Sequence, residues 1–119
     1  MTRTTPERIS GLAEGEIFVF GSNASGQHGG GAARTAADLF GAEWGVGEGL
    51  TGQTYALPTM EGLAAFEQAA ARFVAFAGEH PELTFLLTKV GCGIAGHDDD
   101  LVKVWFAETS PNVVKPPGW

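Results

Sequence analysis

The sequence predicts a compact three-layer α/β/α domain, in which helices cover both faces of a mainly parallel sheet. Short apolar runs alternate with segments of helical periodicity, and two of these runs end directly at a glycine, Gly21 and Gly91. A length of 119 residues is that of one domain, 1–119, with its core at about 16–114. Because ligands in such sheets bind beyond the carboxyl ends of the strands, the loops at Gly21 and Gly91 are expected to converge.

Four strands are predicted. Glu16–Phe20 is a short apolar run of the kind that is buried on both faces of a sheet. Thr54–Pro58 is closed by a proline, which cannot donate to a strand ladder. Leu83–Val90 runs straight into Gly91, and Pro111–Val114 is a short final strand.

Three helices lie between these strands. Gly31–Phe40 has small and apolar residues at helical spacing, and Gly41 is a suitable stop. Met60–Gly78 is the clearest helix, because one apolar stripe follows it: Leu63, Phe66, Ala70, Phe73, Val74 and Ala77. The third begins at the acidic residues 98–100 and continues to about Glu108, with an inner face of Leu101, Val104 and Trp105.

Composition narrows the possible partners. The formal net charge of −7 repels a nucleic-acid backbone, so general nucleic-acid binding is not expected, and a bound anion must be held by backbone amides. The single cysteine excludes an internal disulfide and a multi-cysteine metal site, and no metal or cofactor is predicted. The cysteine usage and the lack of a long apolar run predict a cytoplasmic location without a membrane partner.

Glycines supply the main functional signal. Most of the 18 glycines fall in three turns, Gly21–Gly31, Gly41–Gly52 and Gly91–Gly96. A strand, then such a turn, then a helix N-terminus forms a site for phosphate, since free amide N–H groups and the helix dipole point to one place. Two such turns facing each other would hold a diphosphate.

The third of these turns formally matches the pattern G-x-G-x-x-G. A dinucleotide-binding Rossmann site would need an acidic residue about twenty positions further on, and no carboxylate follows Glu108. A generic phosphate-binding loop and a tight structural turn are the two other interpretations of the pattern.

Four polar residues near the turns are candidates for chemistry, and each has a structural alternative. Asn23 meets a ligand or caps its own turn, and His28 is a general base, a ribose contact or an exposed loop residue. Cys92 is a thiol with a lowered pKa or a small packing residue. Asp98 orients water or caps a helix. Trp44 stacks on a base or packs as a loop lid, while His97 and His80 are expected at the surface.

Taken in order, these motifs resemble a known family. The segment Ile17–Asn23 followed by Gly29–Ala33 resembles the first loop of macro domains, and Val90–Gly96 resembles their second phosphate loop. The latter and Tyr55–Thr59 are closest to the terminal ADP-ribose glycohydrolase branch, and the whole pattern is similar to small bacterial and phage macro-like proteins.

The resemblance implies an ADP-ribose site, with Asn23, His28 and Asp98 as the residues that would act on a substrate. Met60 stands where the glycohydrolase branch has its lysine, and Ala95 where it has an aspartate, so a lysine nucleophile is not expected. The ligand contacts that the resemblance implies are Phe20, Gly21, Ser22, Asn23, Gly29, Gly30, Gly31, Ala32, Gly91, Cys92, Gly93, Ile94, Ala95 and Gly96.

Three functions follow as hypotheses. The first is binding of ADP-ribose or a related NAD-derived nucleotide, with possible hydrolysis of an ADP-ribosyl linkage on a macromolecule. The second is a non-catalytic module that reads or sequesters an NAD-derived signal, for instance in conflict between phage and host. The third is a structural protein without a ligand.

Overall fold

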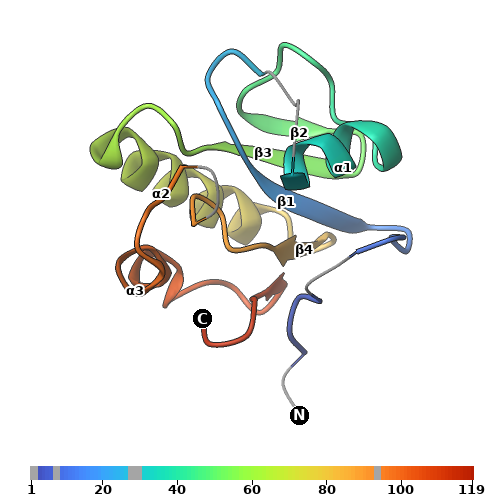
Figure 1. The fold of residues 1–119 in the computed structure, drawn as a ribbon. Coiled ribbons are helices and arrows are strands. Elements are labelled where there is room, and N and C mark those ends of the chain that lie inside the picture. The colour runs from blue at the N-terminus through green and yellow to red at the C-terminus, as the bar shows by residue number, and fades with distance from the viewer. Residues whose placement is uncertain (1–2, 7–8, 27–30, 93–94) are drawn as a thin grey trace.

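The computed structural model describes residues 3–6, 9–26, 31–92 and 95–119. The chain alternates strands and helices, as Figure 1 shows. The elements in chain order are β1 (Glu16–Ser22), α1 (Gly31–Leu39), β2 (Gly49–Thr51), β3 (Thr54–Pro58), α2 (Leu63–Glu79), β4 (Thr84–Leu87), α3 (Asp99–Val102), the one-turn 3₁₀ helix η1 (Lys103–Phe106) and β5 (Val113–Val114).

The strands form one mixed sheet in the order β2-β3-β1-β4-β5. The central strand β1 pairs in parallel with β3 and β4, so that Val19 lies between Tyr55 and Leu87. β5 adds in parallel to β4, whereas β2 is antiparallel to β3. The predicted mainly parallel α/β fold is confirmed, and β2 is an addition that arises inside a segment predicted only as a glycine-rich turn.

Side chains of β1 alternate between two hydrophobic cores, as the pleat of a strand requires. Phe18 and Phe20 pack with residues of α1 on one face. Ile17 and Val19 face α2 and η1 on the other, where the phenylalanine rings of Phe66, Phe73, Phe85 and Phe106 are fully buried. Both faces of the sheet are therefore covered by helices, which is the predicted three-layer order (Figure 1).

The second helix differs from the prediction at its start, and the third differs in its length and in its inner face. α2 begins at Leu63, because Gly62 has a φ of +99° and cannot be a helical residue, and the side chain of Leu63 is 44% exposed. The third helix is short and tightens into η1, with Val102 and Phe106 as its buried residues. The predicted inner residues Leu101 and Val104 are exposed, whereas Val102 and Phe106 face the core.

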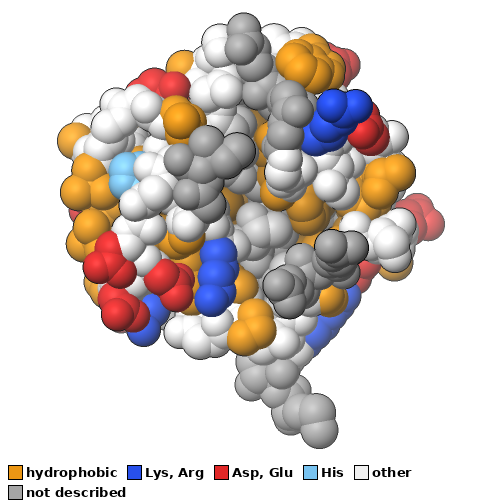
Figure 2. Space-filling view, viewed as in Figure 1, with side chains coloured by type: hydrophobic (Ala, Val, Ile, Leu, Met, Phe, Trp, Pro, Cys, Tyr) orange, Lys and Arg blue, Asp and Glu red, His pale blue; other side chains and the backbone are white. Residues whose placement is uncertain are grey.

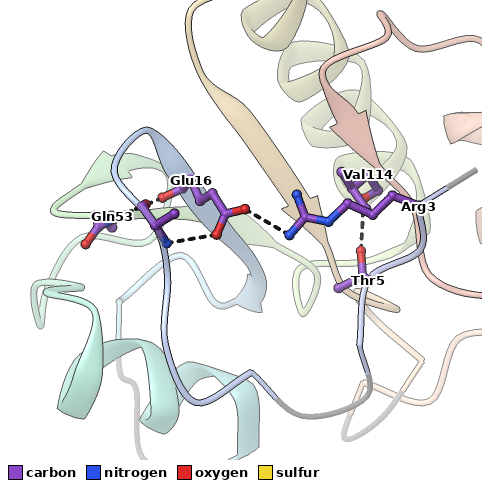
Figure 3. A network of polar contacts seen from close by, with 6 residues as sticks. Arg3, Thr5, Glu16, Gln53 and Val114 are labelled. Atoms are coloured by element: carbon purple, nitrogen blue, oxygen red, sulfur yellow. Dashed lines mark hydrogen bonds and ion pairs between the residues drawn. The ribbon is translucent and has the colours of Figure 1, made fainter.

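Polar contacts, drawn in Figure 3, tie the N-terminal segment to the sheet at β1 and at β5. The Glu16 carboxylate accepts hydrogen bonds from Arg3 (2.8 Å) and from the backbone N–H of Ala13 (2.9 Å). The Thr5 hydroxyl donates to the carbonyl of Val114 (3.0 Å), and the Gln53 amide donates to the carbonyl of Glu16 (3.2 Å). The Glu16 contacts lie at the amino end of β1, whereas Thr5 lies beside the carboxyl end of β5 and lines a cavity with Thr88 and Lys89.

Through Glu16, this network makes the free energy of unfolding depend on pH. The Ala13 N–H and the Arg3 guanidinium lower the pKa of Glu16 below its ordinary 4.5, so its contribution is complete above that pH and is lost as the pH falls through the lowered value. We expect Glu16→Gln to reduce the free energy of unfolding at pH 7 by about 0.5–1 kcal/mol and to flatten its acid dependence, measured by urea unfolding from pH 7 to pH 3. Glu14→Gln alters an exposed neighbouring carboxylate and is the control, so an equal effect there would contradict the prediction.

Candidate functional site

A cavity of about 330 Å³ opens where the carboxyl ends of β1, β3 and β4 meet. The chain leaves β1 toward α1 on one face of the sheet and leaves β3 and β4 toward helices on the other face, so the loops separate at this point. Its walls come from all of these loops and from the start of α1: Gly21, Ser22, Asn23, Gly31, Ala32, Ala33, Thr59, Met60, Thr88, Lys89, Val90, Gly91 and Ala95.

The base of the cavity is formed by close packing of the strand ends. A Cβ atom on Gly21 would lie 3.4 Å from both the Gly91 nitrogen and the Thr59 Cγ2 atom, so a side chain there would begin to fill this space. The N–H of Thr59 donates to the carbonyl of Ser22 at 2.9 Å. The two glycine-containing loops that were predicted to converge are therefore adjacent.

Gly91 carries a buried hydrogen-bond donor that is unpaired within the described part of the chain. Its carbonyl accepts from the His97 N–H at 2.8 Å, but its own N–H donates to none of the described residues. The residue is buried, lines the cavity and has a φ of +77°, which favours glycine. Because buried N–H groups in proteins are almost always paired, this donor needs an acceptor atom from a water molecule or a ligand.

His97 holds this loop against the end of β3. Its Nε2 atom lies 2.9 Å from the Thr59 carbonyl, so the neutral ring carries its proton on Nε2 and donates it there. The ring also contacts Phe66, with centroids 5.1 Å apart. The prediction of a surface histidine was wrong: the side chain is half-buried and connects the loops that follow β3 and β4.

The loop after β1 places Asn23 in the cavity wall. The Ser25 hydroxyl donates to the Asn23 side-chain oxygen at 2.8 Å, and the Gly26 N–H donates to the Asn23 carbonyl at 3.0 Å. The Ala24 N–H donates to the carboxylate of Glu61 at 3.0 Å, which joins this loop to the loop after β3. Asn23 therefore takes part in the hydrogen bonds of its turn and also lines the cavity.

The second glycine-rich segment supports this loop from behind. The Gly45 N–H donates to the Gly26 carbonyl at 2.9 Å, and the Ser22 hydroxyl donates to the carbonyl of Gly47. A Cβ on Gly47 would lie 2.6 Å from the Ala24 carbonyl oxygen, so only glycine permits this approach. Trp44 is 62% exposed and is not among the residues that line the cavity.

Lys89 is a cation in the cavity wall that the sequence reasoning missed. It is the only lysine or arginine among the described lining residues, and its amine lies 3.6 Å from the Asp99 carboxylate. Figure 2 shows acidic side chains gathered over α3 with basic side chains beside them. A lysine two residues before the glycine that follows the predicted strand 83–90 is the signal that could have identified it.

A second cavity of about 420 Å³ adjoins the first. Thr88 and Lys89 line both, and the far wall comes from Thr5 and the prolines of the two chain ends, Pro6, Pro116 and Pro117. The Thr88 hydroxyl donates to the Val19 carbonyl at 2.8 Å, which fixes the boundary between the two cavities.

The predicted site residues divide into three groups. Seven line the first cavity: Gly21, Ser22, Asn23, Gly31, Ala32, Gly91 and Ala95. Four lie elsewhere: the Phe20 ring is fully buried in the core, Gly96 and Cys92 do not line the cavity, and Asp98 caps α3 by accepting the Asp100 N–H at 3.0 Å. The remaining five lie outside the described residues, namely His28, Gly29, Gly30, Gly93 and Ile94.

Cys92 has the character of a packing residue. Its thiol points to the Val90 carbonyl at 3.6 Å, and its N–H donates to the carbonyl of Lys89. Burial, followed by the charge of Asp99, raises the pKa of the thiol. The interpretation as a low-pKa nucleophile was therefore wrong, and so was the expectation that its N–H is free for a phosphate.

Comparisons with protein-family models, with curated proteins and with solved structures find no match. Within residues 3–6, 9–26, 31–92 and 95–119, no group of three or more His, Cys, Asp or Glu side chains is arranged to hold a metal ion. No helix in these ranges has the length and apolar character needed to cross a membrane.

Proposed function

We propose that this protein binds ADP-ribose or a related NAD-derived nucleotide, with its diphosphate in the cavity at the carboxyl ends of β1, β3 and β4. The observation that carries the proposal is that Gly91, whose buried N–H has no acceptor among the described residues, lines the same cavity as the start of α1. A helix N-terminus offers free N–H groups and a positive dipole end, so an oxyanion between these two elements meets donors from both.

Electrostatics support an anion of limited size. The net charge of −7 disfavours a polyanion, whereas Lys89 adds one local positive charge to the backbone donors. The two cavities that share Thr88 and Lys89 measure about 330 and 420 Å³. ADP-ribose, which has a nucleoside at one end and a ribose at the other, would extend from one cavity to the other with its diphosphate at Lys89.

The described residues favour binding over hydrolysis. Of the three residues proposed to act on a substrate, Asn23 lines the cavity, Asp98 caps α3, and His28 lies outside the described residues. Lys89 is ion-paired with Asp99, and burial raises the pKa of the Cys92 thiol. The site is therefore proposed as that of a module that reads or sequesters the nucleotide.

The binding test uses calorimetry with the full chain. We expect heat from ADP-ribose, and we expect Lys89→Met to weaken its affinity roughly tenfold, which is ~1.4 kcal/mol. Lys103→Met removes the same charge from η1, outside the cavity, and is the matched control. An absence of heat with ADP-ribose, NAD and ADP would overturn the proposal. Equal losses of affinity in Lys89→Met and Lys103→Met would show that Lys89 does not contact the ligand.

A second measurement separates binding from catalysis. Incubation with an ADP-ribosylated protein is expected to release no ADP-ribose, because the described lining residues include no activated nucleophile. Release by the wild type that is lost in Asn23→Ala would instead identify a hydrolase, with Asn23 as a residue that orients the reacting group.

A further inference from the structure

A chain of polar contacts runs from the turn after β5 to the cavity wall. The indole N–H of Trp119 donates to one carboxylate oxygen of Asp99, and the other oxygen lies 3.6 Å from the Lys89 amine. One carboxylate is thus shared between an aromatic donor on one side and the cavity lysine on the other.

Trp119 itself is firmly placed. Its ring stacks on that of Phe106, with centroids 5.5 Å apart and planes at 18°, and Phe106 is fully buried. Its backbone N–H donates to the carbonyl of Pro116 at 3.1 Å, which closes a turn next to the second cavity. The indole N–H that donates to Asp99 therefore belongs to a ring that is held in place by Phe106.

Without the Asp99 carboxylate, no comparable contact among the described residues would fix the Lys89 side chain. Its side chain is 47% exposed, and a lysine side chain has many rotamers, so holding it in one place costs conformational entropy. Asp99 is 44% exposed and lies at the start of α3, so one oxygen held by Trp119 restricts where the other can meet the amine.

We propose that Trp119 and Asp99 are positioning residues, which hold the Lys89 amine at the wall shared by the two cavities. The turn after β5 thereby determines how well the site binds an anion, although Trp119 is not among the described lining residues of either cavity. The effect on affinity rests on the proposed function, whereas the effect on Lys89 mobility does not.

The first test needs no ligand. Side-chain order of Lys89 is measured by NMR relaxation at its Cε position in the wild type, Trp119→Phe and Asp99→Ala. Trp119→Phe retains the stack on Phe106 and removes only the donor, so the fold should persist. Lys89 is expected to become more mobile in both variants while Lys103, which pairs with Asp100 at 3.1 Å, is unchanged. Unchanged order at Lys89 would overturn the proposal.

The second test is a double-mutant cycle on ADP-ribose affinity. Trp119→Phe is expected to weaken binding roughly threefold in the wild type and to have no effect in the Lys89→Met background. Equal losses in both backgrounds would show a general structural role and contradict the positioning of Lys89. If the wild type does not bind ADP-ribose, the proposed function fails, and the mobility of Lys89 alone decides the positioning role.

Discussion

Gly91→Ala is expected to destabilise the fold by about 2–4 kcal/mol and to abolish ADP-ribose binding, the largest effect of any single substitution in the cavity. The left-handed backbone at φ +77° disfavours any residue with a Cβ. The added Cβ would also overlap the Phe66 ring and lie 2.7 Å from its Cζ atom.

Phe66 cannot give way to this new methyl group. Its ring is fully buried, with the rings of His97 and Trp105 at centroid distances of 5.1 and 5.0 Å. The loop must move instead, which displaces the Gly91 N–H from the cavity. Urea unfolding measures the stability loss, and calorimetry measures the binding.

Gly96→Ala is the control that separates backbone strain from steric overlap with Phe66. Gly96 is in the same loop at φ +74°, but nothing lies within 4 Å of the position that a Cβ would take there. It should therefore cost only the backbone strain of roughly 1 kcal/mol and leave binding intact. Similar results for Gly91→Ala and Gly96→Ala would show that the packing against Phe66 does not place the donor.

Gly26→Ala is expected to have the second largest effect, a loss of about 3 kcal/mol in stability and at least a roughly tenfold loss in ADP-ribose affinity. Gly26 is buried at φ +69°, and its Cβ would overlap the Val46 nitrogen and lie 2.8 Å from the Gly45 Cα. These are backbone atoms of the supporting segment, so the two loops must separate. Asn23 would move with its loop, because the Gly26 N–H donates to its carbonyl.

The matched control is Gly45→Ala on the facing segment. Gly45 has a φ of +89°, and a Cβ added to it would meet open space, so this variant carries the strain without the collision. We expect binding close to that of the wild type and a stability loss of roughly 1 kcal/mol by urea unfolding. Wild-type affinity in Gly26→Ala would mean that the second glycine-rich segment does not support Asn23.

Local patterns in the sequence were enough to predict most of the fold. Thr54–Pro58 is a strand with the predicted bounds, and Gly41 ends the first helix with a φ of +86°. These features depend on residues within a few positions of each other, where periodicity and glycine geometry decide. The third helix was predicted with the wrong inner face, because a short helix that tightens into a 3₁₀ turn shifts the side chains that face inward.

By itself, the sequence determined the order of the strands and helices other than β2, and the convergence of the loops at Gly21 and Gly91, because apolar runs and glycines are local signals. Only the tertiary structure decided which groups share the cavity. Lys89, Thr59 and the N–H of Gly91 are brought together by parallel pairing of β1 with β3 and β4. The same packing joined His97 to the Thr59 carbonyl and left Asp98 outside the cavity. Contacts between residues distant in the chain depend on the sheet order, which no local pattern specifies.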